Sequence, residues 1–310
     1  MRIGLVFGGN TAEGNVSKQT AECVRGALNL TGKEVINIEY NKNIATNIQD
    51  ANIDVVFNAM HGQYGEDGCL QGLLNIMQIP YTHSGVTASA IGMNKFISNN
   101  IFRSINIPTI RGIVVTKQDL YNGNWKEIIK HSEISECKEF FVKPIAGGSS
   151  VDTFLIHDIN QFTFETIELR ENNNLFLIQE RIIGKEVQVA IIDNNVIGML
   201  EIVPNKELSE FFDYKAKYSE NGATHQQLDE SDEIKNKLST FAKNAHDALG
   251  CNCVSRVDFL LTNEKNIRIL EINTHPGLTS LSILPDIARN AGIEYENIIE
   301  ILLKNAKFGS

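Results

Sequence analysis

Short apolar runs of strand length alternate along this chain with segments whose apolar residues recur at helical spacing. The stretches 2–7 (RIGLVF), 54–60 (DVVFNAM) and 139–144 (EFFVKP) are typical of buried strands, whereas 69–77 (CLQGLLNIM) and 236–250 (NKLSTFAKNAHDALG) have the period of amphipathic helices. This alternation favours an α/β fold over an all-helical or all-strand one. Because 310 residues exceed the usual size of one hydrophobic core, we expect two or three domains or subdomains.

The bulk composition is that of an ordinary soluble globular protein, with a formal net charge of −10. This charge opposes attraction to nucleic acid or anionic lipid, so we expect neither partner. No stretch approaches the roughly 18 apolar residues of a membrane-spanning helix, and the start carries no signal-peptide cleavage pattern. The few cysteines do not resemble a secreted disulfide framework. We therefore predict a cytoplasmic protein.

Two acids and an amide interrupt apolar runs near the end of the chain. Asp258 lies between Val257 and Phe259, and Asn273 is two residues beyond Glu271 and thus on the same face of an extended chain. Hard oxygen donors without His or Cys suit Mg²⁺ or Mn²⁺. On spacing alone, solvent-facing charges at strand ends are the more common arrangement, and both interpretations stay open.

A glycine-rich loop follows the predicted strand that contains Lys143. Residues 147–150 (GGSS) offer backbone N–H groups and hydroxyls without side-chain bulk, which suits a loop over phosphate oxygens. The same composition is also typical of a flexible turn, and Lys95, on a predicted amphipathic helix, also fits a solvated charge. No Walker A motif occurs, and residues 7–14 (FGGNTAEG) do not form a dinucleotide fingerprint.

Eight motifs occur in an order that resembles the ATP-grasp superfamily and, within it, the D-alanine–D-alanine ligase family, along nearly the whole chain. They are GGNTAEGNVS (8–17), HGQYGEDGCLQGLL (61–74), IPYTHSG (79–85), MNK (93–95), VKPIAGGSSV (142–151), FFDYKAKY (211–218), RVDF (256–259) and EINTHPGLTSLSILP (271–285). The resemblance implies a three-subdomain ATP-grasp architecture, α/β overall and α+β in its ATP-grasp part. The expected parts are an N-terminal Rossmann-like parallel-sheet domain at 1–90, a central subdomain at 91–180, and a C-terminal subdomain at 181–310 with the metal site and a mobile lid.

The resemblance also implies roles for individual residues. ATP would be bound by Lys95, Lys143, Ser150, Glu180, Arg181, Ile182, Ile183, Glu186 and Lys217. Two Mg²⁺ or Mn²⁺ ions would be bound by Asp258, Glu271 and Asn273, with Glu271 bridging them. The expected catalytic residues are Glu13, Ser149, Tyr218, Arg256 and Gly277, the last through its amide. The expected substrate contacts are His61, Glu66, Ser282 and the amide of Ile283.

The implied activity is ATP-dependent ligation of two D-alanine molecules through an acyl phosphate, for synthesis of peptidoglycan precursors. Such a reaction needs positioning, and cations beside the moving phosphoryl group, but no protein nucleophile. Ser17, Cys69 and Ser149 are therefore not expected to form covalent intermediates. The stretch 207–225, which mixes aromatic and charged residues without clean periodicity, is expected to form the lid that excludes water. A homodimer is expected from the family.

The chain departs from the family pattern in places. The departures are Gly14-Asn15 for Arg-Glu, Asn94 for Asp, and Gly147 and Asp152 for the Glu and Gly of the phosphate loop. None removes a predicted metal ligand or phosphate-binding lysine. Tyr218 stands where relatives that prefer a hydroxy acid as second substrate are expected to carry Phe, which favours D-alanyl-D-alanine as the product.

Three alternative functions stay open. A ligase of this family with D-lactate or another amino acid as second substrate would share the same motifs. A degenerate domain that holds nucleotide without turnover would find support in the altered phosphate loop. A nicotinamide-dependent oxidoreductase would fit the α/β pattern and the early glycines, but it lacks its fingerprint and leaves Asp258, Glu271 and Asn273 unexplained.

Overall fold

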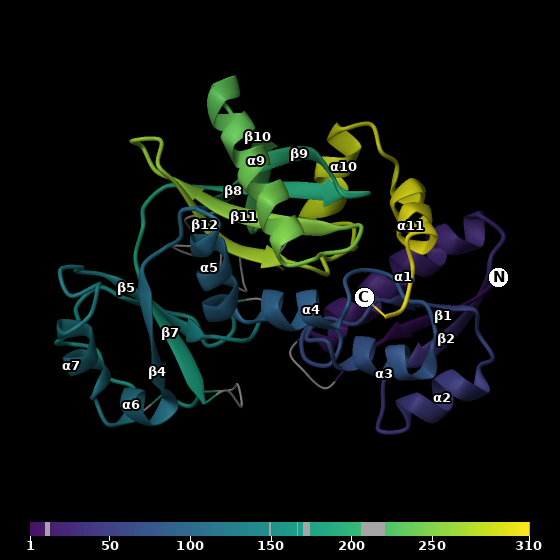
Figure 1. Cartoon of the computed structure of the whole chain (residues 1–310), viewed down its shortest axis with the longest axis horizontal. Helices are drawn as coiled ribbons and strands as arrows, with labels where there is room; N and C mark the ends of the chain where they lie inside the picture. Colours follow the sequence, from purple (N-terminus) through teal and green to yellow (C-terminus); the bar gives the residue numbers. More distant parts are fainter. Residues whose placement is uncertain (10–12, 149, 166, 170–173, 206–220, 310) are drawn as a thin grey trace.

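The computed structural model (Figure 1) describes residues 1–9, 13–148, 150–165, 167–169, 174–205 and 221–309. In this part of the chain the strands form three sheets, one in each of three lobes. The predicted mixed α/β class with a parallel N-terminal sheet is confirmed. Among the described residues no helix is long and apolar enough to cross a membrane. All five cysteines are free thiols.

The N-terminal lobe is built around a parallel sheet with the strand order β2-β1-β3. Its strands are β1 (Arg2–Phe7), β2 (Glu34–Glu39) and β3 (Val55–Asn58), and its helices are α1 (Gly14–Leu30), α2 (Ile44–Asp50) and α3 (Cys69–Met77). α11 (Tyr295–Lys304) packs against α1, so both ends of the chain lie in this lobe. Ile3 and Leu5 of β1 share a core with Val24 of α1 and Ile298 of α11. Burial on both faces explains the continuous apolar run of β1.

The central lobe holds an antiparallel sheet with the order β4-β7-β5-β6. Its strands are β4 (Gly112–Thr116), β5 (Phe140–Pro144), β6 (Phe154–Ile156) and β7 (Leu175–Glu180), and its helices are α6 (Lys117–Tyr121) and α7 (Trp125–Lys130). Trp125, Phe140, Phe164 and Phe176 are fully or almost fully buried in its core. The helices α4 (Val86–Met93) and α5 (Lys95–Ser104) connect this lobe with the N-terminal one (Figure 1).

The third lobe contains an antiparallel sheet with the order β10-β9-β8-β11-β12. Its elements are β8 (Lys185–Ile192), β9 (Asn195–Pro204), β10 (Ala223–Gln227), α9 (Asp232–Ala248), β11 (Ser255–Leu261), β12 (Ile267–Asn273) and α10 (Ile283–Asn290). One face, with Val187, Val257 and Phe259, packs against α9 and α5. Because strand residues alternate between faces, Gln188, Asp258 and their neighbours two residues away belong to the opposite face.

A β-bulge in β12 decides which residues reach that opposite face. Phe259 of β11 is paired with Ile269, but the preceding residue, Asp258, is paired with Glu271, so Leu270 is the extra residue. Without this bulge Glu271 would share the face of the core residue Ile269. The bulge therefore places Glu271 beside Asp258 while Ile269 stays in the core.

Several elements match the sequence predictions and others do not. The helix predicted at 69–77 is α3, whereas the helix predicted at 236–250 begins earlier, at Asp232, because Ser231 caps it by accepting a hydrogen bond from the amide of Ile234. The three sheets fall within the segments 1–90, 91–180 and 181–310, but those boundaries stay a prediction. Most of the predicted lid lies outside the described residues, and its last residues, from Ala223, form part of β10.

Candidate active site

Four polar side chains lie together on the face of β11 and β12 that α9 does not cover. Asp258 is paired directly with Glu271, and Arg256 is paired with Asn273. Directly opposed residues of antiparallel strands project to the same face. The three oxygen donors predicted to bind metal therefore share one face with the predicted oxyanion donor, Arg256.

Arg256 compensates the burial of the Asp258 carboxylate. Asp258 is only 2% exposed, and Nε and Nη2 of Arg256 each lie 2.8 Å from one of its carboxylate oxygens. Burial alone would lower the pKa of the Arg256 guanidinium, but the charge and hydrogen bonds of Asp258 raise it instead. Such a bidentate pair holds both charges in place inside the protein.

Lys95 joins this carboxylate face to the glycine-rich loop. It is the first residue of α5, and its Nζ lies 3.3 Å from Oε2 of Glu271 and donates to the carbonyl of Gly147 at 2.6 Å. The amide of Lys95 also donates to the carbonyl of Ile145, at 2.8 Å. The ammonium group is therefore held between a predicted metal ligand and the predicted phosphate loop.

The glycine-rich loop begins after Lys143, which lies on β5, and approaches Glu13 just before α1. A Cβ atom at Gly148 would lie 2.8 Å from Oε1 of Glu13, so a side chain there would displace the Glu13 carboxylate from this position. Gly147 has φ +151°, a value that residues with a side chain rarely adopt. Ser150, in the same loop, also has a positive φ, of 57°. The loop thus reaches Glu13 of the N-terminal lobe through two glycines.

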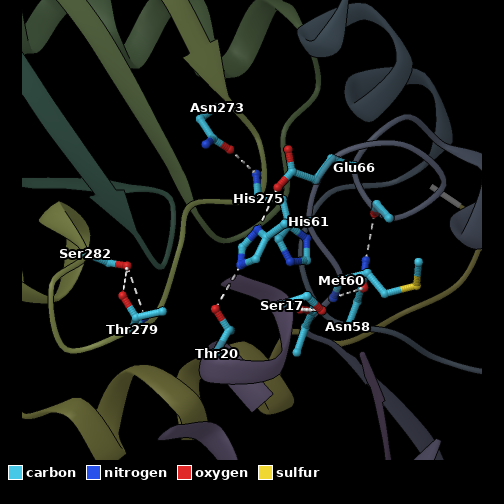
Figure 2. A network of polar contacts seen from close by, with 12 residues as sticks. Ser17, Thr20, Asn58, Met60, His61, Glu66, Asn273, His275, Thr279 and Ser282 are labelled. Carbon is cyan, nitrogen blue, oxygen red and sulfur yellow. Dashed lines mark hydrogen bonds and ion pairs between the residues drawn. The ribbon is translucent and has the colours of Figure 1, made fainter. Parts of the chain in front are cut away.

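His61, which follows β3, is held from both ring nitrogens (Figure 2). Its Nδ1 lies 2.8 Å from Oε1 of Glu66, and its Nε2 lies 2.9 Å from the hydroxyl of Thr20 on α1. Burial alone would lower the pKa of His61, but the hydrogen bond and charge of Glu66, with the charge of Glu13, raise it above its ordinary value. The ring is therefore fixed in orientation and biased toward its charged form.

A second histidine connects His61 with the turn after β12. The amide of His275 donates to Oδ1 of Asn273 at 2.8 Å (Figure 2). The His275 ring contacts His61 edge-to-face, with centroids 5.5 Å apart, and stacks on His83 at 3.7 Å. Burial lowers the pKa of His83 to about 3 and that of His275 well below its ordinary value. His275 and His83 have no role predicted from the sequence, because this contact joins residues far apart in the chain.

The turn continues into a compact loop before α10. Oγ of Ser282 accepts a hydrogen bond from the amide of Thr279 at 3.0 Å and lies 2.9 Å from its hydroxyl (Figure 2). A Cβ atom at Gly277 would lie 2.8 Å from Oγ of Ser282, so a side chain there would displace the Ser282 hydroxyl. Ser282 is the N-cap residue of α10, and Ile283 is its first residue. Amides at a helix N-terminus favour an anionic group.

The predicted nucleotide hinge joins β7 to β8. At its start, the Glu180 carboxylate accepts hydrogen bonds from the Arg111 guanidinium, and Nη1 of Arg181 donates to Glu139 at 3.0 Å. Ile183 is 71% exposed, so its apolar side chain is accessible to a ligand at the hinge. Ile182 lies between Arg181 and Ile183 in the same connection.

Glu186, predicted to lie near the ribose, is on β8 and shares the face of the acids. Its Oε1 accepts a hydrogen bond from Nε2 of Gln188 at 2.9 Å, and Gln188 is paired directly with Asp258. The hinge, the ribose candidate and the metal candidates therefore follow one another across a single face of the third sheet.

Ser149, Lys217 and Tyr218 lie outside the described residues. Among the residues that are described, no group of three or more His, Cys, Asp and Glu side chains could hold a metal ion. The candidate donors are instead two carboxylates and one amide, Asp258, Glu271 and Asn273. This all-oxygen set fits Mg²⁺ or Mn²⁺, which fill other positions with water and phosphate oxygens.

Comparison with known proteins gives one consistent family. The family model "D-ala D-ala ligase C-terminus" matches residues 101–304, and "D-ala D-ala ligase N-terminus" matches residues 39–84. A D-alanine–D-alanine ligase of Rickettsia canadensis is 39% identical over 311 residues, covering 99% of this chain and 84% of the relative. One of a Wolbachia species from Drosophila simulans is 36% identical over 311 residues, covering 98% and 93%. The solved D-alanine–D-alanine ligase of Bacillus anthracis complexed with ATP matches with a TM-score of 0.81 and 26% identity, covering 98% of this chain and 96% of that one.

Proposed function

This chain belongs to the D-alanine–D-alanine ligase family, and on that premise we propose that it joins two D-alanine molecules at the expense of ATP. Similarity over 99% of the chain supports the proposal. The structural observation that carries it is the double contact of Lys95 with Glu271 and with the Gly147 carbonyl. This contact brings the carboxylate face and the glycine-rich loop to one place, as transfer of a phosphoryl group requires.

The proposed reaction has two steps. A carboxylate oxygen of the first D-alanine attacks the γ-phosphorus of ATP, the bond from that phosphorus to the β–γ bridging oxygen breaks, and ADP leaves. The free amino group of the second D-alanine then attacks the acyl carbon, the bond from that carbon to the phosphate oxygen breaks, and phosphate leaves as the nitrogen releases a proton. Positioning and charge stabilisation account for both steps without a protein nucleophile.

The proposed nucleotide contacts start from the position of Lys95. Its ammonium group lies where a triphosphate between the loop and the carboxylate face would meet it. The other proposed ATP contacts are Lys143, Ser150, Glu180, Arg181, Ile182, Ile183, Glu186 and Lys217. The exposed Ile183 supports an adenine position at the hinge, and the shared face of Glu186 and Asp258 supports a nucleotide that runs from the hinge toward the acids.

Asp258, Glu271 and Asn273 are the proposed ligands of two Mg²⁺ or Mn²⁺ ions. Bound dications would supply charge neutralisation for the triphosphate. The all-oxygen donor set on one face supports this assignment. Arg256 contacts Asp258 and Lys95 contacts Glu271, so the same face also carries the protein cations suited to an anionic ligand.

The proposed substrate contacts lie mainly in two loops, the one after β3 with His61 and Glu66 and the one before α10 with Gly277 and Ser282. Glu13, His61 and Glu66 are proposed for the first D-alanine, Ser282 and the Ile283 amide for the carboxylate of the second, and Arg256 with the Gly277 amide for the developing oxyanion. Ser149 and Tyr218 are proposed to complete this set. The contact of Glu13 with Gly148 supports a first-substrate site that adjoins the phosphate loop.

The family also supports a wider biological assignment. We propose that the dipeptide serves synthesis of peptidoglycan precursors, that the protein acts in the cytoplasm, and that it works as a homodimer. We further propose that its functional parts divide at 90/91 and 180/181.

The test of the proposed activity is phosphate release from ATP in the presence of Mg²⁺ and D-alanine, with the product identified by mass spectrometry. D-Alanyl-D-alanine formed in equal amount to phosphate is the expected result. Binding of ATP without D-alanine-dependent phosphate release would instead identify a nucleotide-binding module. Equal D-alanine and D-lactate in one reaction test the second substrate, and a mainly ester product would exclude D-alanine as the preferred one.

A further inference from the structure

Arg111, just before β4, holds the end of β7 where the proposed adenine hinge begins. We propose that Arg111 is a positioning residue for nucleotide binding, which acts by fixing Glu180 and thereby the main chain of the hinge. This inference deepens the proposed function and rests on the hinge assigned there. Neither the sequence motifs nor the family resemblance pointed to Arg111.

Arg111 binds Glu180 through both its main chain and its side chain. Its carbonyl accepts the amide of Glu180 at 3.1 Å, and its own amide donates to Oε1 of Glu180 at 3.2 Å. Its Nε and Nη2 donate to Oε2 of Glu180 at 3.1 and 2.6 Å. Four hydrogen bonds between two residues fix the position and the direction of the last residue of β7.

The guanidinium also ties this pair to a third segment. Nη1 of Arg111 donates to the carbonyl of Glu133 at 3.0 Å, and the Cys137 thiol lies 3.7 Å from Oε2 of Glu180. Oε1 of Glu133 in turn accepts the amide of Gly112 at 3.2 Å. The start of β4, the segment before β5 and the end of β7 therefore meet at one guanidinium.

The backbone next to Arg111 is packed too tightly for a side chain. A Cβ atom at Gly112 would lie 2.6 Å from the carbonyl oxygen of Ile178 and 2.8 Å from Cγ of Gln179. Because the first of these neighbours is backbone, it cannot move aside cheaply. Gly112 thus lets β4 approach β7 closely, and this approach brings the Arg111 guanidinium onto Glu180.

The side chains of Glu180 and Arg181, at the start of the hinge, form ion pairs with other protein residues. The Glu180 side chain is 15% exposed, and although burial raises its pKa, the hydrogen bonds and charge of Arg111 lower it overall, so it stays ionised against Arg111. Arg181 is directed to Glu139 in the same way. Adenine at this hinge would therefore meet main-chain groups and the exposed Ile183, and its affinity would depend on how well that main chain is held.

Arg111→Met tests the proposal, because methionine keeps the apolar stem and removes every guanidinium hydrogen bond. We expect KM for ATP to rise on the order of tenfold, the change that about 1.4 kcal/mol of lost binding produces. We expect kcat and KM for D-alanine to stay within about twofold. The guanidinium does not contact the proposed metal ligands Asp258 and Glu271, nor the loops that carry the proposed substrate contacts. Arg111→Lys, which keeps the charge without the fork, should give a smaller rise.

Arg103→Met is the matched control. Arg103 reaches the same residue, Glu133, with Nη2 3.8 Å from Oε1, and makes no contact with Glu180. Its removal should leave KM for ATP unchanged. Glu180→Gln combined with Arg111→Met should cost less than the product of the two single effects, since both remove one interaction.

Titration of ATP followed by calorimetry separates this inference from the proposed activity. If the wild type binds ATP but forms no dipeptide, the proposed function fails, and weaker ATP binding by Arg111→Met alone still supports the role of Arg111. Unchanged ATP affinity in folded Arg111→Met overturns it. Equal increases in KM for ATP and D-alanine, with a lowered melting temperature, would also overturn it in favour of a purely structural role. If Arg111→Met does not fold, the same criteria apply to Arg111→Lys.

Discussion

Replacing Arg256 by methionine would remove the bidentate cation from the buried Asp258 carboxylate inside the third sheet. Asp258 is 2% exposed, and the Arg256 side chain is 13% exposed, so solvent screens the pair weakly. Removal of one partner of such a buried pair costs about 3–5 kcal/mol, because the other charge stays desolvated. That loss is a large part of a typical folding free energy of about 5–15 kcal/mol. We therefore expect Arg256→Met to be strongly destabilised.

Urea unfolding followed by circular dichroism, without nucleotide or divalent cation, measures this loss. Asp258→Asn added to Arg256→Met should recover much of it, because the buried negative charge is then gone. Arg268→Met is the control, since Nη1 of Arg268 donates to a backbone carbonyl, that of Ile267. A loss below about 1 kcal/mol for Arg256→Met, the range of exposed ion pairs, would show that the burial of Asp258 does not depend on Arg256. So would a failure of Asp258→Asn to restore stability.

Two further predictions concern the loops beside α1. Glu66→Gln should lose stability of about 1.5–3 kcal/mol at low pH. Because the pKa of His61 is raised in the folded protein, this contribution is present below pH about 6.5 and is lost as the pH rises through the raised value, so the difference from wild type should shrink between pH 6 and pH 9. A constant difference would contradict a charged His61. Gly277→Ala should raise KM for D-alanine several-fold, because the new Cβ, 2.8 Å from Oγ of Ser282, displaces that hydroxyl from Thr279. Gly72→Ala is the control, since a Cβ atom there would meet nothing within 4 Å. An equal rise in KM for both variants would argue against the Ser282 contact.

Much of the site can be read from the sequence because its residues are local to motifs. The spacing of Glu271 and Asn273 places them on one face of a strand, and the structure has them there. The bulge at Leu270 is not readable, since an extra strand residue leaves no periodic signal and is defined only against the partner strand. The face shared with Asp258 therefore depends on a feature that the sequence pattern does not indicate.

Contacts between segments far apart in the chain are the other feature that the sequence does not indicate. His83 lies before α4 and His275 follows β12, far along the chain, yet their rings stack with centroids 3.7 Å apart. Arg111 and Glu180 come from strands that pair only when the central sheet has formed. Such side chains look like ordinary polar surface residues in a sequence, because the partners that fix them are set by topology. The family resemblance transferred motif residues but not these supporting contacts.

Phosphate release by Glu271→Gln tests whether ATP activates D-alanine at the carboxylate face of β11 and β12, which Lys95 joins to the glycine-rich loop. Loss of the Glu271 charge, which lies 3.3 Å from Lys95 and opposite Asp258, should lower D-alanine-dependent phosphate release by at least a hundredfold in the folded protein. Glu264→Gln, in the turn between the same two strands, should release phosphate at the wild-type rate. Near-normal release by Glu271→Gln would place the reaction elsewhere and contradict the account.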